Sequence, residues 1–68
     1  MATGTIRWFS HTRGYGFIEP DDGGTDLFVH FSNVAGGRHK QLDEGIRVQF
    51  ETKRGSKGVE ATDVSPVG

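Results

Sequence analysis

Aromatic rings and glycines alternate behind an arginine in the stretch RGYGFI, at residues 13 to 18. Tyr15 and Phe17 are two residues apart, as are Phe28 and His30 in the stretch DLFVHFS, at residues 26 to 32. Side chains two residues apart on a β-strand point to the same face of the sheet. Each pair therefore either fills a core or presents flat rings on an open surface, where the available chemistry is stacking on other flat groups.

Other combinations of reactive residues do not form a recognisable site. The sequence has no cysteine, and His11, His30 and His39 lack the spacing of metal ligands, so we expect no metal and no cofactor. The serines have no evident base to activate them, and so small a chain has little room for a desolvated cleft. We therefore expect no enzymatic activity and no small-molecule substrate. The glycines around Tyr15 lack the pattern of a phosphate-binding loop and are expected to relieve crowding beside the rings.

The formal net charge of −1 at pH 7 argues against a protein that wraps a nucleic-acid duplex, because such proteins need a large positive surplus. The charges are nevertheless segregated along the chain. Residues 1–18 contain two arginines and no acid, residues 19–26 contain four acids, and residues 47–57 contain four bases against one acid. One face of the folded chain can therefore be basic although the total charge is not.

Short runs of β-branched and aromatic residues, separated by Gly, Asp and Ser, predict a chain made of strands. Eleven glycines and two prolines leave no room for a long helix. The predicted strands cover residues 4–10, 15–20, 26–31, 45–54 and 58–65. The stretch PDDGGT at 20–25 has the composition of a hairpin loop, which predicts antiparallel pairing of the second and third strands. The connection 32–44 is expected to contain one short turn of helix.

An all-β chain of this size must not leave its strand edges open, so we expect a five-stranded antiparallel Greek-key barrel. Five strands indicate the oligonucleotide/oligosaccharide-binding (OB) fold, with an SH3-like barrel as the structural alternative. We expect residues 1–68 to form a single domain that buries about 60% of the surface its unfolded chain exposes. Neither a signal peptide nor an apolar stretch long enough to span a membrane is visible, so we expect a cytoplasmic protein with no membrane partner.

Alternation along the strands gives the predicted barrel two candidate faces. The aliphatic one comprises Ile6, Ile18, Leu27, Val29, Val48, Phe50 and Val64, and the aromatic one comprises Tyr15, Phe17, Phe28 and His30. The aromatic side also carries Glu19 and Asp26, and burying it would remove these carboxylates from water without an obvious partner. The sequence therefore predicts an aliphatic core and an exposed aromatic surface, which suits stacking with unpaired bases.

Four segments, GTIRWF at 4–9, RGYGFI at 13–18, DLFVHFS at 26–32 and LDEG at 42–45, resemble the bacterial cold-shock domain proteins along nearly the whole chain. The resemblance implies a monomeric barrel that binds single-stranded RNA and DNA with little sequence preference, as an RNA chaperone or transcription antiterminator. Carried over by position, the family's binding surface falls on Arg7, Trp8, Phe9, Arg13, Tyr15, Phe17, Phe28, His30, Phe31, His39 and Lys57. The resemblance assigns stacking to the rings and phosphate contacts to Arg7, Arg13 and Lys57.

Alternation disagrees with the resemblance at two rings. In an ideal strand Trp8 shares the inward face of Ile6, so its exposure requires an irregularity or the end of the strand. Alternation likewise places Phe31 on the face opposite Phe28 and His30.

The chain also departs from the family's usual residues. Arginine stands at positions 7 and 13, where lysine is commoner, and histidine stands at position 39, where a loop aromatic is expected. In the last predicted strand Val59 and Glu60 replace the usual Pro and Gln. Glu60 either repels a phosphate or faces solvent.

Two other uses of the aromatic surface remain open at this stage. The same barrel architecture can bind a protein or an oligosaccharide through such a surface, which predicts binding that ignores nucleic acid. The surface can also be the interface of a homodimer, which predicts dimers in sedimentation and a shielded Trp8.

Overall fold

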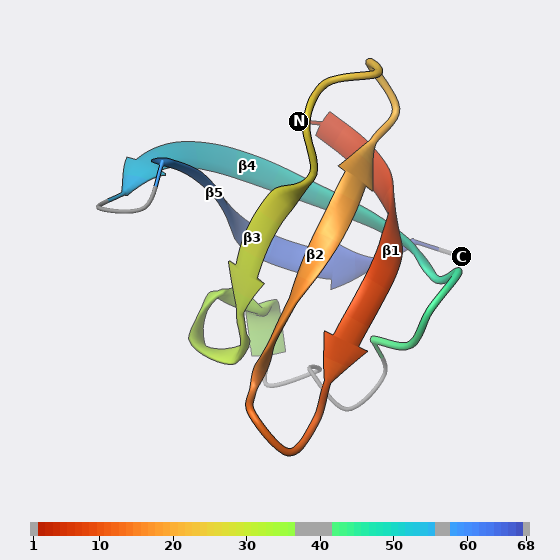
Figure 1. Ribbon diagram of the computed structural model, residues 1–68, viewed down its shortest axis with the longest axis vertical. Coiled ribbons are helices and arrows are strands. Elements are labelled where there is room, and N and C mark those ends of the chain that lie inside the picture. The colour runs from red at the N-terminus through yellow and green to blue at the C-terminus, as the bar shows by residue number, and fades with distance from the viewer. Residues whose placement is uncertain (1, 37–41, 56–57, 68) are drawn as a thin grey trace.

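The computed structural model describes residues 2–36, 42–55 and 58–67. The elements in chain order are β1 (Ala2–Ser10), β2 (Tyr15–Pro20), β3 (Leu27–His30), the 3-10 helix η1 (Phe31–Asn33), β4 (Arg47–Gly55) and β5 (Gly58–Pro66) (Figure 1). All of the predicted strands are present, and each of their ends lies within two residues of the predicted position. The short helical turn is also present, although it begins at Phe31 rather than after residue 32. Among the described residues no helix is long and apolar enough to cross a membrane.

The strands close into a barrel in the order β1-β2-β3-β5-β4, with β4 pairing back to β1. In Figure 1 β1, β2 and β3 form the front layer, and β4 and β5 cross behind them. β1 pairs antiparallel with β2 and β4, β2 with β3, and β4 with β5. The closed five-stranded barrel is the predicted OB architecture, and the predicted hairpin between β2 and β3 is confirmed.

One contact differs from the antiparallel expectation. β3 and β5 run parallel, and within the described ranges a single residue pair, Phe28 with Glu60, joins them. The parallel direction follows from the other pairings: β1 is antiparallel to β2 and β4, and β3 and β5 are antiparallel to these two in turn, so both run in the direction of β1. This contact matters for the site because Phe28 is one of its predicted rings.

The core is aliphatic, as predicted, and draws side chains from all five strands. Its buried members are Ile6, Ile18, Val29, Val34, Leu42, Val48, Phe50, Ala61 and Val64. Leu27 was predicted in the core but is only partly buried against it. Val34 and Leu42 were not predicted there; they follow η1 and precede β4, and Val34 forms a parallel bridge with Val64 of β5. None of the described polar or charged residues is buried.

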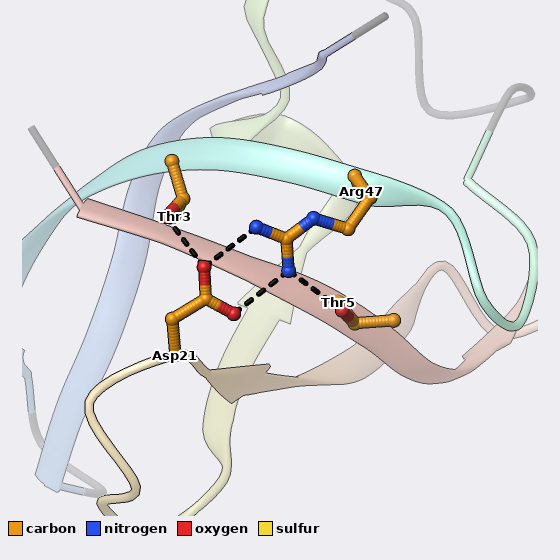
Figure 2. Close-up of polar contacts among 4 residues, drawn as sticks. All are labelled: Thr3, Thr5, Asp21 and Arg47. Atoms are coloured by element: carbon orange, nitrogen blue, oxygen red, sulfur yellow. Dashed lines mark hydrogen bonds and ion pairs between the residues drawn. The ribbon is translucent and has the colours of Figure 1, made fainter.

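A polar cluster on the outside of the barrel joins three segments that are distant in sequence (Figure 2). The Nη1 and Nη2 atoms of Arg47 donate to the Oδ1 and Oδ2 atoms of Asp21 at 2.7 and 2.6 Å. Arg47 Nη1 also donates to Thr5 Oγ1 at 3.0 Å, and Thr3 Oγ1 donates to Asp21 Oδ2 at 2.7 Å. The hydrogen bonds from Arg47, and then from Thr3, hold the pKa of Asp21 well below its ordinary value. The cluster ties the end of β2 to β1 and β4.

Candidate nucleic-acid interface

The four rings predicted from alternation lie side by side on β2 and β3. Tyr15 is the cross-strand partner of His30, and Phe17 is the partner of Phe28. The ring centroids of Tyr15 and Phe28 are 5.7 Å apart with an interplanar angle of 27°, and those of Phe17 and Phe28 are 6.0 Å apart at 74°. All four side chains are partly exposed, and none belongs to the core cluster. The prediction that this side of the sheet faces outward is confirmed.

Trp8 joins the same surface through a β-bulge. The pairing of β1 with β2 runs regularly to Ile6 opposite Ile18 and resumes with Trp8 opposite Phe17, so Arg7 is an extra residue in β1. Ile6 is therefore 1% exposed, whereas Trp8, two residues later, is 45% exposed. The indole ring lies 6.2 Å from Phe17 in a stacked arrangement and 5.5 Å from Tyr15. The sequence predicted that Trp8 could be exposed only through an irregularity or the end of the strand, and the bulge is that irregularity.

Phe31 is exposed because β3 ends one residue before it. Alternation placed Phe31 on the core side, which is wrong, since the chain leaves the strand at His30 and enters η1. The side chain is 44% exposed, and its ring lies 4.6 Å from that of His30. The backbone N–H of Ser32 donates to His30 Nδ1 at 3.3 Å, so His30 caps η1 and its ring is fixed beside Phe31. We call Trp8, Tyr15, Phe17, Phe28, His30 and Phe31 the aromatic face.

Two glycines allow the rings to come this close. An added Cβ at Gly16 would lie 2.7 Å from the Cα of Phe9 on β1, so the backbones of β1 and β2 could not keep their spacing. Gly14 has φ +79°, and an added Cβ there would lie 2.8 Å from the ring of Phe31. The expectation that these glycines relieve crowding is confirmed.

Phe9, which the resemblance placed on the binding surface, lies apart from the other rings. Its side chain is partly buried and packs against the core, and its ring neighbours that of His11 at 5.1 Å. Of the remaining predicted residues, His39 and Lys57 lie outside the described residues.

Arg13 lies at one edge of the aromatic face. Its Nη1 atom is 3.5 Å from the hydroxyl of Tyr15. Together with Tyr15, Phe17, Phe28 and His30, Arg13 lines a shallow open depression on the surface. A cation at the rim of a ring-lined depression can contact a phosphate while the neighbouring base stacks.

Arg7 lies at the opposite edge and already has partners. Its Nε atom is 2.9 Å from Asp26 Oδ2, and its Nη2 atom is 3.4 Å from Glu19 Oε2. These are the two carboxylates for which the sequence suggested no partner. They pair with Arg7, which reaches from β1 to β2 and to the residue before β3. The charge of Arg7 is therefore locally balanced.

Other parts of the described chain do not bring the predicted site residues together. A separate apolar hollow of about 480 Å³, lined in part by Pro20, Leu27, Phe50 and Val59, includes none of the predicted site residues. Among the described residues no group of three or more His, Asp or Glu side chains could hold a metal ion. The aromatic face is therefore the place where the predicted residues converge.

Comparisons with known proteins agree with this geometry. The family model described as "'Cold-shock' DNA-binding domain" matches residues 2–67. The "Major cold shock protein" of Micrococcus luteus is 51% identical over 65 residues, which cover 96% of this chain and 97% of the relative. The "Cold shock protein" of Arthrobacter globiformis is 52% identical over 67 residues, covering 98% of this chain and all of the relative (100%).

A solved structure shares the fold at lower sequence identity. The structure named "drosophila Unr CSD456" superposes with a TM-score of 0.77 at 22% identity, over 98% of this chain and 26% of that one. At this identity the match speaks for the barrel alone. The family model and the two bacterial relatives, by contrast, cover nearly the whole chain, so the protein belongs to the cold-shock domain family of nucleic-acid-binding proteins.

Proposed function

We propose that the protein is a cytoplasmic monomer that binds single-stranded RNA and DNA by stacking unpaired bases on the aromatic face. The observation that carries this proposal is the bulge at Arg7, which brings Trp8 onto the surface already formed by the rings of β2 and β3. A soluble barrel would gain stability by burying such a ring. Here the extra residue in β1 instead places the ring on the surface.

The energies are sufficient for useful affinity without a basic surface. Stacking on aromatic side chains contributes about 1–3 kcal/mol per base. Three or four stacks, discounted for non-additivity, supply much of the roughly 8 kcal/mol that a micromolar complex requires. A net charge of −1 is therefore compatible with binding. Duplexes should bind poorly, because their bases are already stacked on one another.

In the cell, we propose, this binding makes the protein an ATP-independent RNA chaperone or transcription antiterminator. A protein that binds only the open strands of a hairpin shifts the equilibrium toward the open form by mass action. The affinity for the open strand limits the size of this shift, so only weak hairpins are opened. Neither catalysis nor a cofactor is needed for this activity.

The test is a titration of the fluorescence of Trp8, the only tryptophan, with a short oligothymidine and with its duplex. We expect quenching by the single strand alone. Phe28→Ala should weaken binding about 5-fold to 160-fold, which corresponds to the loss of one stack of about 1–3 kcal/mol. Val67→Ala, which removes apolar surface from a residue that is 47% exposed and outside the aromatic face, should leave binding unchanged. Equal binding by wild type and Phe28→Ala would refute the stacking proposal.

The chaperone activity needs a separate assay. An RNA hairpin with a fluorophore and a quencher at its two ends should open on addition of the wild-type protein without ATP, and should stay closed with Phe28→Ala. If no nucleic acid quenches Trp8, the aromatic face serves a protein, an oligosaccharide or a second copy of the chain, and sedimentation then separates the last of these from the others.

A further inference from the structure

The apolar hollow of about 480 Å³ lies at the end of the barrel where β3 and β5 begin. Leu27 precedes Phe28 in β3, and Val59 precedes Glu60 in β5. Because the two strands run parallel, Leu27 and Val59 lie on the same side of the Phe28–Glu60 pair, and both line the hollow. The hollow therefore lies beside the one described residue pair that joins these strands.

The hollow leaves apolar side chains uncovered. Leu27, which was predicted in the core, is only partly buried, and Val59 is 46% exposed. Pro20 and Phe50 add to the apolar lining. Sites for small molecules are concave, mostly apolar and roughly 300–1,000 Å³ in volume, a range that includes this hollow. An apolar group placed here would cover these side chains and leave water itself, which is favourable in proportion to the area buried.

The charges at the hollow determine which occupant it favours. Asp21 and Asp22 line it, and none of the described lining residues is Lys, Arg or His. Asp21 is already paired with Arg47, at 2.6 Å between Oδ2 and Nη2. Asp22 accepts the backbone N–H of Gly24 at Oδ1, at 2.9 Å, and within the described ranges no cation pairs with it. An apolar occupant that also carries a positive charge can therefore pair with Asp22.

We propose that the hollow binds a small apolar cation, an amine that carries one aromatic or aliphatic group. The apolar group contacts Leu27 and Val59, and the ammonium pairs with Asp22. The site is separate from the aromatic face, because Leu27 and Phe28 are successive residues of β3 and point to opposite sides of the sheet. The inference goes beyond the proposed function and does not depend on it.

The experiment titrates the full chain, labelled with nitrogen-15, with three probes at neutral pH and follows the amide resonances by NMR. The probes 2-phenylethylamine, 2-phenylethanol and 3-phenylpropanoate share a ring and a two-carbon linker and carry a positive charge, no charge and a negative charge. We expect saturable shifts at Gly24, Leu27 and Val59. The amine should bind about two- to fivefold tighter than the alcohol, as for an exposed ion pair, and the carboxylate should bind more weakly than the alcohol.

Two variants separate a local charge effect from a general one. Asp22→Asn keeps the acceptor for the Gly24 N–H, so the loop is retained, and the amine should lose its advantage over the alcohol. Glu44→Gln makes the same change in net charge in the exposed turn before β4 and should keep that advantage.

Three results would overturn the inference. The first is the absence of saturable shifts at the hollow, including the case in which the amine shifts Tyr15 and Phe28 on the aromatic face instead. The second is a carboxylate that binds as tightly as the amine. The third is an amine advantage that survives in Asp22→Asn. The titration of Trp8 with oligothymidine tests the proposed function separately, since none of these probes is a nucleic acid.

Discussion

Releasing Arg7 from its two carboxylates should make binding of single strands more dependent on salt. In the free protein Arg7 contacts Asp26 at 2.9 Å and Glu19 at 3.4 Å. When Arg7 moves to a phosphate, the carboxylates it leaves take up cations from solution, which offsets the counterions that the phosphate releases. The double variant Glu19→Gln, Asp26→Asn removes this offset and changes the formal net charge from −1 to +1, since two negative charges are lost.

The size of the effect follows from counterion release. One additional phosphate contact on a single strand steepens the slope of log K against log salt by about 0.7. Over a fourfold rise in salt, this amounts to an extra loss of affinity of about 2.6-fold in the double variant. Titrations of Trp8 with oligothymidine at four salt concentrations measure the slope.

The matched control is Glu44→Gln with Asp43→Asn, which produces the same net charge in the turn before β4. This control raises affinity through the long-range field but should leave the slope within error of the wild type. If the Glu19/Asp26 variant and the control show the same slope, Arg7 does not contact a phosphate and the reasoning is refuted.

Three further predictions concern the barrel itself. Gly16→Ala should lower the free energy of unfolding by about 1–3 kcal/mol, because its Cβ has no room beside β1; urea denaturation measures this, and an unchanged midpoint would contradict the close approach of the strands. Deletion of Arg7 should leave a regular β1–β2 ladder with Trp8 still outward, so its emission should remain that of an exposed indole; a blue shift would show that Arg7 is not the bulge residue. The stability that Asp21 contributes should be fully present above its unfolded-state pKa of about 3.8 and be lost as pH falls toward its lowered folded-state pKa. The difference in stability between wild type and Asp21→Asn, measured from pH 7 to pH 2, should therefore shrink only in acid, and a constant difference would exclude this linkage.

The strands and the two faces were predictable because alternation is a local property. Ile18 and Val29 share an apolar face with their neighbours, and Tyr15 and Phe28 share an aromatic one, whatever the tertiary structure does. The reason for choosing the core was also local, since an aromatic core would have buried Glu19 and Asp26. For these residues the pattern and the packing lead to the same arrangement.

The alternating pattern did not predict residues whose positions depend on where a strand ends or on segments outside the strands. Phe31 was placed inward because nothing in the sequence marks His30 as the last residue of β3. Val34 and Leu42 complete the core from outside the strands, where alternation says nothing. The pairing of Arg7 with Asp26 and Glu19 joins three segments that are separate in the sequence, so residue types alone did not identify it.

Among the described residues one pair alone joins β3 and β5, and this has a consequence for the motions of the barrel. A sheet opens most readily where its ladder is shortest, and here that place is the seam between Phe28 and Glu60. Phe28 also belongs to the aromatic face and its ring neighbours those of Tyr15 and Phe17, so each opening of the seam displaces a ring of this surface. The apparent affinity is then reduced by the fraction of molecules in which the seam is open. Warming should accordingly lower the affinity for single-stranded nucleic acid before the barrel unfolds. An oligonucleotide bound across the seam should slow hydrogen exchange of the β3 amides.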